Sequence, residues 1–565
     1  MPKKRHDREP PKQAEEIQRQ MGESLNTQKK QIAQASWWIL LAIILIVAGI
    51  RYRLLDVPLE RDEGEYAYAA QLILQGLSPY VHLYNMKLPG IYAAYTVLLS
   101  IFGDTHTGIH TGLLLINILT TVLIFLLAQR LFNPLAGIAS AGSFGILSLG
   151  QSVRGVSANA EHFVILAAVG GLLLLLMASE RKQWSLFFAS GLLFGLGFII
   201  KQHGIAFILA GCAIFLIQSK HTRPFSWKLF YRHGLALVGG MLLPYATTCL
   251  VFLVAGSFGK FWFWTFEYAK AYSSQMPLDK GLANLQAMAY RILGDSWAIW
   301  ALVGIGLSAL LWAKNARRHS SFLILFALFS FLGICPGLYF RPHYFLFMLP
   351  VSALLAGVAV SSLAMIWSGS MLSWSRFSIG LLITVSALSF TLFQQRAYLF
   401  RMTPFEVSRS TYGANPFPES LEIASYIRSH TAKDDQIAVI GSEPQIYFYS
   451  ERKAATGYIY TYAMMENHDF ALKMQEQMIK EIENAEPVYI VYIDPNSIPL
   501  SWLPHKDSHW QIYKWFKRYR AQHYTRVGLI EIYKDVPSYR WGEKANGSPR
   551  SKYWVEVLRR KSKKQ

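Results

Sequence analysis

The chain has 565 residues, of which 52% are hydrophobic and only 16% are charged. Soluble globular domains carry about 25% charged residues, so much of this chain does not face water and an ordinary cytosolic enzyme is excluded. The formal net charge of +20 on a membrane chain indicates anionic lipids or phosphate ligands, and nothing in it requires a nucleic acid.

The first 30 residues are polar, with charges of both signs. They lack the apolar segment and small-residue cleavage site of a signal peptide. We therefore expect residues 1–30 to be a cytoplasmic basic tail, followed by an uncleaved signal anchor at 31–50.

Long stretches without charge predict the membrane spans, because a bilayer core about 30 Å thick needs roughly 20 apolar residues of helix. Residues 88–103 have only 16 charge-free positions and begin Leu-Pro-Gly, so we expect them at the membrane interface. Eleven stretches are long enough to cross: 31–50, 105–129, 131–153, 162–179, 183–200, 202–219, 233–259, 296–313, 319–340, 342–375 and 377–395.

The distribution of Lys and Arg orients these spans. With eleven crossings and a cytoplasmic N-terminus, the inner loops hold more Lys and Arg than the outer ones, whereas a crossing at 88–103 removes that excess. The fold class predicted is thus an α-helical polytopic membrane protein of about 11 transmembrane helices, with a transmembrane domain at 31–400. Its first outer loop is 51–104.

That loop begins with an acidic cluster, Asp62, Glu63 and Glu65, at the start of an amphipathic helix. Acidic residues are common in the first turn of a helix because they face exposed N–H groups, which is the purely structural interpretation. Other polar residues reach the same membrane face in the eleven-span arrangement: Lys87, Arg154, Asn159, Glu161, Lys201, Gln202, His203, Arg341 and His343. Singly, the cations could be snorkelling to headgroups and Glu161 could pair with Arg154, but together they predict one site.

Residues 401–565 are more polar and predict a soluble α/β extracytoplasmic domain. We expect helices at 416–430 and 471–483, and strands at 436–440, 446–449, 488–493 and 528–533. No glycine-rich phosphate loop is present in this part of the sequence.

The first outer loop resembles a known family. The acid pair Asp62-Glu63, the segment Tyr-Ala-Tyr-Ala-Ala-Gln, Gly76-x-x-Pro79-Tyr80 and Lys87-x-Pro89 are similar to the protein O-mannosyltransferase and aminoarabinose transferase superfamily of GT-C type glycosyltransferases. The family commonly has two prolines after the lysine, whereas Leu88 stands between Lys87 and Pro89 here. The resemblance covers roughly residues 36–400.

The resemblance implies transfer of a sugar from a polyprenyl-phosphate donor to an acceptor hydroxyl at the extracytoplasmic face of the plasma (inner) membrane, usually with inversion. Because the leaving group is a phosphate ester, one carboxylate can serve as base while cations hold the phosphate. By family position Asp62 is the expected base, and Glu63 would position the acceptor or hold Asp62. Lys87 and Arg341 are the expected phosphate ligands, with His343, Lys201, Glu161 and Tyr80 as further substrate-binding residues.

Cofactor, acceptor and reaction class stay partly open. No metal site is assigned, although some members of the fold class use a divalent cation. The acceptor can be a lipid, a protein or a glycan. The alternatives are a transporter or flippase of a lipid-linked sugar, a non-catalytic assembly subunit, and a polymerase or ligase of surface glycans. Transporters usually show internal repeats and charges near mid-membrane, and this sequence shows neither.

Overall fold

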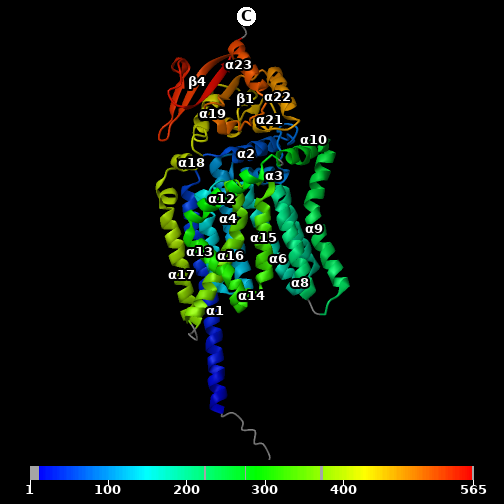
Figure 1. Ribbon diagram of the computed structural model, residues 1–565, viewed down its shortest axis with the longest axis vertical. Coiled ribbons are helices and arrows are strands. Elements are labelled where there is room, and N and C mark those ends of the chain that lie inside the picture. The colour runs from blue at the N-terminus through cyan, green and yellow to red at the C-terminus, as the bar shows by residue number, and fades with distance from the viewer. Residues whose placement is uncertain (1–11, 222–223, 274, 369–372, 563–565) are drawn as a thin grey trace, which may run out of the picture.

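The chain forms a bundle of long helices with a mixed α/β domain stacked on one end (Figure 1). The computed structural model describes residues 12–221, 224–273, 275–368 and 373–562. The N-terminal helix leaves the bundle at the end opposite to the α/β domain, so the first and last described residues, Lys12 and Ser562, lie on opposite sides of the bundle.

Most helices of the bundle follow the charge-free stretches of the sequence. The helices of the bundle are α1 (Lys12–Arg53), α4 (His106–Leu131), α5 (Pro134–Leu147), α6 (Ala160–Arg181), α7 (Trp184–Ile200), α8 (Ile205–His221), α9 (Trp227–Val254), α13 (Trp297–Trp312), α14 (Lys314–Arg318), α15 (Ser320–Ile334), α16 (Leu349–Ser368) and α17 (Ser373–Gln394). The exceptions are α14, a charged turn, and the beginning of α1, which lies in the charged N-terminal tail.

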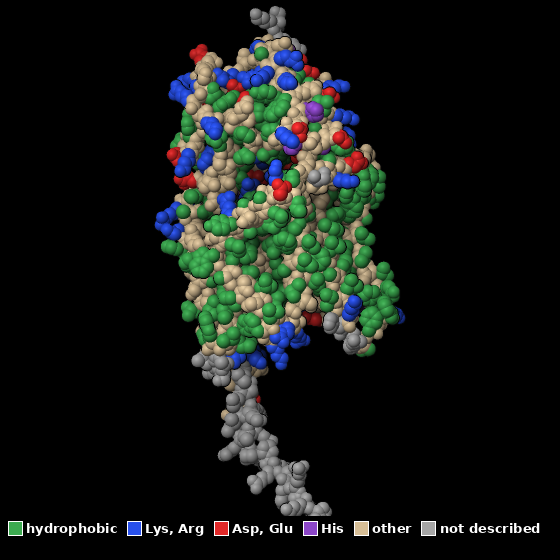
Figure 2. All heavy atoms as spheres, viewed as in Figure 1, with side chains coloured by type: hydrophobic (Ala, Val, Ile, Leu, Met, Phe, Trp, Pro, Cys, Tyr) green, Lys and Arg blue, Asp and Glu red, His purple; other side chains and the backbone are tan. Residues whose placement is uncertain are grey.

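Within the described residues, seven helices are long and apolar enough to cross a membrane, or eight if α12 (Leu278–Asp295) and α13, which meet at a bend of 106°, count as one broken span. The predicted number of eleven requires the shorter apolar helices α5, α7 and α15 to cross as well. The polytopic helical fold is therefore confirmed, while the number of eleven stays a prediction. Figure 2 shows the apolar side chains covering the bundle and the charged ones gathered above and below it.

Short helices lie between the bundle and the α/β domain (Figure 1). The first outer loop supplies α2 (Arg61–Leu74) and α3 (Pro89–Phe102). A second connection contributes α10 (Phe258–Trp262), the π-helical turn η3 (Phe263–Tyr268), α11 (Ala269–Ser273) and α12. The 14 residues of α3 equal those of α5 in number, so its length alone does not decide whether it crosses.

The α/β domain is built on a six-stranded sheet with the strand order β2-β1-β3-β6-β4-β5. The pairs β1–β2 and β1–β3 are parallel, and the other neighbours are antiparallel. The strands are β1 (Gln436–Ile440), β2 (Lys453–Ala454), β3 (Tyr489–Ile493), β4 (Tyr524–Ile532), β5 (Ser538–Trp541) and β6 (Tyr553–Arg560). The helices are α18 (Pro404–Tyr412), α19 (Glu419–Ser429), α20 (Gln445–Ser450), α21 (Tyr462–Met465), α22 (Ala471–Ala485) and α23 (Gln511–His523).

One predicted strand is wrong. Residues 446–449 form the middle of helix α20. The run is short and entirely apolar, and such a run does not distinguish a strand from a buried helix turn. Here the helix packs its aromatic side chains against α2, and the ring centroids of Tyr68 and Tyr447 are 5.2 Å apart.

Two hydrophobic cores organise the molecule. The first lies within the helical bundle. The second runs without interruption from α2 and α3 into the sheet, and includes Tyr68, Tyr95, Ile446 and Val491. The first outer loop and the α/β domain are therefore packed as one unit.

Candidate functional site

A cavity of about 610 Å³ lies where the bundle, the first outer loop and the α/β domain meet. Charged side chains are visible inside the hollow at this level of the molecule (Figure 2). Seven of the residues that the sequence predicts for one site line the cavity: Asp62, Lys87, Lys201, Gln202, His203, Arg341 and His343. They come from four separate segments of the chain, so only the fold brings them together.

Asp62 lies in the first turn of α2. Its Oδ1 accepts hydrogen bonds from Lys87 Nζ at 2.7 Å and from the Tyr460 hydroxyl at 3.2 Å. Burial raises the pKa of the Asp62 carboxyl, but Lys87, His343 and Lys201 together lower it more, and the pKa lies well below its usual range. The carboxylate is therefore charged at neutral pH and can accept a proton or a hydrogen bond.

Lys87 stands between two carboxylates. Its Nζ is 2.5 Å from Glu65 Oε2 as well as 2.7 Å from Asp62, and it lies over the ring of Tyr66. Glu65 is fully buried and also accepts a hydrogen bond from Tyr92 at 2.6 Å. Burial lowers the pKa of Lys87, but both carboxylates raise it more, so the side chain keeps its charge.

Tyr80 contacts the backbone of Lys87. Its hydroxyl donates to the Lys87 carbonyl at 2.6 Å, and its ring packs against Phe252 and Phe261. Tyr80 is fully buried, has a left-handed backbone with φ +63°, and does not line the cavity. The structure thus shows Tyr80 holding the loop that carries Lys87.

Glu63 points away from the cavity. Its Oε1 accepts from the Ala158 N–H at 2.6 Å and lies 2.9 Å from His110 Nε2, while Oε2 accepts from the Glu60 N–H at 3.1 Å. This carboxylate completes a capping box at the start of α2 and ties that turn to the bundle. Glu63 therefore determines where the neighbouring Asp62 is held.

Glu161 and Lys201 form a buried ion pair at the bundle end of the site. His343 Nε2 lies 4.0 Å from the same Glu161 oxygen, and Lys201 Nζ lies over the ring of Tyr344. Glu161 itself does not line the cavity. Arg154, which the sequence suggested as its partner, stacks instead on Tyr412.

Arg341 differs from the two lysines. Its guanidinium donates to the Tyr272 hydroxyl at 3.3 Å and stacks on Tyr339, and within the described residues it forms no ion pair with a carboxylate. Its charge is therefore the least compensated of the predicted cations that line the cavity. The attraction between Arg341 and a phosphate group would therefore be the least reduced by neighbouring carboxylates.

The α/β domain contributes cavity residues that sequence reasoning missed: Tyr460, Tyr462 and Glu466. Burial raises the pKa of Glu466 to about 7, although the hydrogen bond from Tyr268 and the charge of Arg341 both lower it. No motif marks these positions. The only available signal was the Tyr-rich run at 458–462, ahead of the polar helix predicted at 471–483.

No group of three His, Cys, Asp or Glu side chains suited to a metal ion occurs among the described residues. A divalent cation is therefore left unassigned.

Residues 87–252 match the family of dolichyl-phosphate-mannose-protein mannosyltransferases. A search of curated protein sequences finds no significant match. Among solved structures, the chain is similar to ArnT from Cupriavidus metallidurans bound to undecaprenyl phosphate, with a TM-score of 0.53, 17% identity, and coverage of 82% of this chain and 95% of that one. The apo state of ArnT gives a TM-score of 0.55 at 16% identity, covering 83% of this chain and 95% of that one.

The archaeal oligosaccharyltransferase AglB from Archaeoglobus fulgidus, in complex with an inhibitory peptide and a dolichol-phosphate, is also similar. Its TM-score is 0.50 at 13% identity, and the match covers 90% of this chain and 74% of that one. These likenesses and the family match confirm the resemblance inferred from the first outer loop. The chain has the GT-C fold, with a sheet-containing domain at its C-terminal end.

Proposed function

We propose that the chain is a membrane glycosyltransferase that moves a sugar from a polyprenyl-phosphate carrier to an acceptor hydroxyl, with Asp62 as the general base. The observation that carries this proposal is that a charged Asp62 carboxylate and the Arg341 guanidinium, which forms no ion pair within the described residues, line the same cavity. The solved structures with the same fold contain undecaprenyl phosphate in ArnT and a dolichol-phosphate in AglB.

The chemistry of the reaction suits these groups. A phosphate ester leaves as a stable anion, so it needs nearby cations and no proton donor. Arg341 is the first phosphate ligand in this proposal, with Lys87, Lys201 and His343 beside it. Asp62 takes the proton of the acceptor hydroxyl as its oxygen attacks the anomeric carbon and the bond from that carbon to the phosphate oxygen breaks. Direct displacement of this kind inverts the anomeric centre.

The position of the cavity suits a lipid-linked donor. A polyprenyl chain gains about 0.8 kcal/mol for each buried CH₂ and stays in the bilayer, so its phosphate reaches only sites at the membrane surface. The cavity lies at the end of the apolar bundle, where such a headgroup would stand. We place this end, and the α/β domain with it, on the extracytoplasmic side of the plasma membrane.

Asp62→Asn provides the direct test. The variant keeps the side-chain volume and can no longer accept a proton. Purified protein in liposomes should lose transfer from the lipid-linked sugars extracted from the host membrane, with products identified by mass spectrometry. The matched control is Asp56→Asn, because Asp56 lies in the same loop and its side chain is 73% exposed. Wild-type transfer that survives in Asp62→Asn would remove Asp62 as the base.

A second measurement addresses the phosphate. Undecaprenyl phosphate should bind the wild type and bind Arg341→Met at least tenfold more weakly, whereas exposed Arg396→Met should bind it normally. Equal binding by both variants would contradict the role of Arg341. Movement of the lipid-linked sugar across the liposome without transfer would instead support a flippase.

A further inference from the structure

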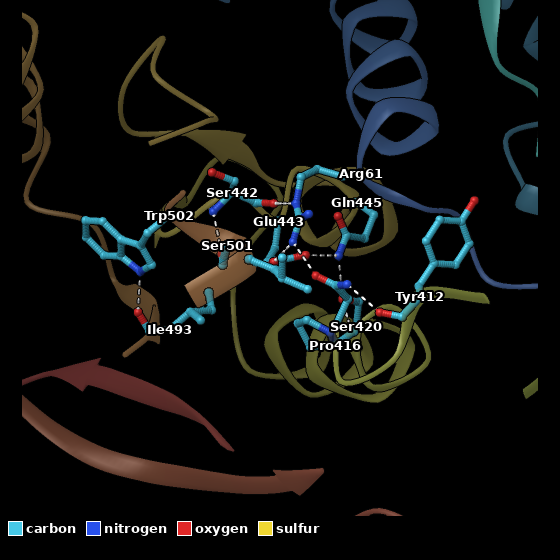
Figure 3. Close-up of polar contacts among 12 residues, drawn as sticks. Arg61, Tyr412, Pro416, Ser420, Ser442, Glu443, Gln445, Ile493, Ser501 and Trp502 are labelled. Carbon is cyan, nitrogen blue, oxygen red and sulfur yellow. Dashed lines mark hydrogen bonds and ion pairs between the residues drawn. The ribbon is translucent and has the colours of Figure 1, made fainter. Parts of the chain in front are cut away.

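The α/β domain is fastened to the turn of α2 that carries Asp62. Arg61, one residue earlier, donates to the Ser442 carbonyl, to Asn415 Oδ1 at 2.9 Å and to Glu443 Oε1 at 2.5 Å. Figure 3 shows the Arg61 side chain reaching from α2 toward Ser442 and Glu443. Glu443 is fully buried and the Arg61 side chain is 11% exposed, so the pair is shielded from water.

A second bond reaches Asp62 itself. The Tyr460 hydroxyl shares its one proton between the Arg61 carbonyl at 2.8 Å and Asp62 Oδ1 at 3.2 Å. Tyr460 is buried and belongs to the segment between β2 and α21. The Asp62 carboxylate is thus held by Lys87 of the first outer loop and by Tyr460 of the α/β domain.

The remainder of α2 is bound to the same domain. The Leu59 N–H donates to the Tyr449 hydroxyl at 2.8 Å, before the helix begins. The Ala454 N–H donates to the Tyr68 hydroxyl at 2.8 Å, two turns further along. A Cβ atom added at Gly64 would lie 2.5 Å from the Gln445 backbone nitrogen, so the two backbones are in direct contact.

From these contacts we propose that the α/β domain is an integral part of the catalytic centre, with Tyr460 as the positioning residue for Asp62. This inference rests on the proposed function. The Arg61–Glu443 pair holds the backbone of the first turn, and the Tyr460 hydroxyl selects the orientation of the carboxylate. Without the Tyr460 hydroxyl, Asp62 keeps its charge and its ion pair through Lys87 but loses one of the two contacts that fix the orientation of its carboxylate.

The expected effect is on turnover and not on binding. A base that is charged but misaligned binds substrates normally and removes the acceptor proton less often. Tyr460→Phe removes only the hydroxyl oxygen and should lower kcat about tenfold, the equivalent of one hydrogen bond to a charged group. The KM values for donor and acceptor should stay within about twofold of wild type.

Tyr458→Phe is the matched control. Tyr458 lies two residues earlier, and its hydroxyl donates to Gln477 at 3.0 Å, away from Asp62. Both variants are compared with wild type in liposomes for kcat, for each KM and for thermal unfolding.

A kcat loss in Tyr460→Phe alone, with both KM values and the thermal midpoint unchanged, supports the positioning role. Equal kcat in Tyr460→Phe and Tyr458→Phe, while Asp62→Asn is inactive, would overturn this inference and leave the proposed function standing. Full transfer by Asp62→Asn would instead refute the proposed function itself.

Discussion

Replacing Lys87 by Met separates its effect on Asp62 from a contact with the substrate phosphate. The methionine keeps most of the length of the side chain and removes the ammonium that lies 2.7 Å from Asp62 and 2.5 Å from Glu65. Both carboxylates then lose their cation, Glu65 in a fully buried position and Asp62 at the cavity wall, where its side chain is 27% exposed.

The charge of Lys87 opposes the effect of burial on Asp62. A cation in contact lowers the pKa of a carboxyl by about 1–3 pH units, so its loss leaves the effect of burial less opposed. Burial raises a carboxyl pKa by up to about 3–5 pH units, and we therefore expect the pKa of Asp62 in the variant to lie well above the ordinary value of about 3.9. The variant should therefore lose activity as the pH falls from about 7 to 5, because the base becomes protonated, whereas the wild type should not.

The stability of the variant should change with pH in the opposite direction. Breaking a buried ion pair by removing one partner costs about 3–5 kcal/mol, because a charge is left uncompensated. Glu65 is the buried partner here, and a proton relieves its charge. Its pKa in the folded variant is raised above the unfolded value, so the folded state binds the proton more tightly and stability falls as the pH rises.

The assay combines rates and unfolding in one buffer series. The kcat/KM and the thermal midpoint of Lys87→Met are measured from pH 5 to pH 8, with exposed Lys260→Met as the matched control. We expect activity to rise and stability to fall across the series for Lys87→Met alone. A variant with the wild-type pH dependence and only a higher donor KM would refute the reasoning, since Lys87 would then act on the substrate phosphate and not on Asp62.

Two further predictions concern the packing of α2 and the orientation of the chain. Gly64→Ala should lower the free energy of unfolding by about 1–3 kcal/mol and reduce kcat, because its Cβ would meet the Gln445 backbone at 2.5 Å. Gly49→Ala, where nothing lies within 4 Å, is the control, and equal thermal midpoints for the two variants would contradict the contact. In a chain whose three native cysteines are replaced, Asp535→Cys should react with a membrane-impermeant thiol reagent in intact cells and Asn315→Cys only after permeabilisation. The reverse pattern would refute the proposed orientation.

The membrane character of the chain could be predicted from the sequence because it depends on local composition. Each charge-free stretch needs the bilayer whatever its neighbours are, so the positions of α1, α4, α6 and α9 follow from counting residues between charges. The strands β1, β3 and β4 could also be predicted, because local composition indicates them as well. The number of crossings is harder to predict, since α5, α7 and α15 are apolar but short, and packing decides whether such a helix spans.

The sequence by itself also marked the acidic start of α2 and the cations that accompany it along the chain. The tertiary structure alone decided how these charges are paired. Lys87 is held between Asp62 and Glu65, and Arg341 has no carboxylate partner within the described residues. Tyr460 reaches Asp62 from 398 positions along the chain, and no local pattern can encode a contact of that range. Pairing depends on distance in space, because Coulomb and hydrogen-bond energies fall steeply with separation, and only the folded chain determines those distances.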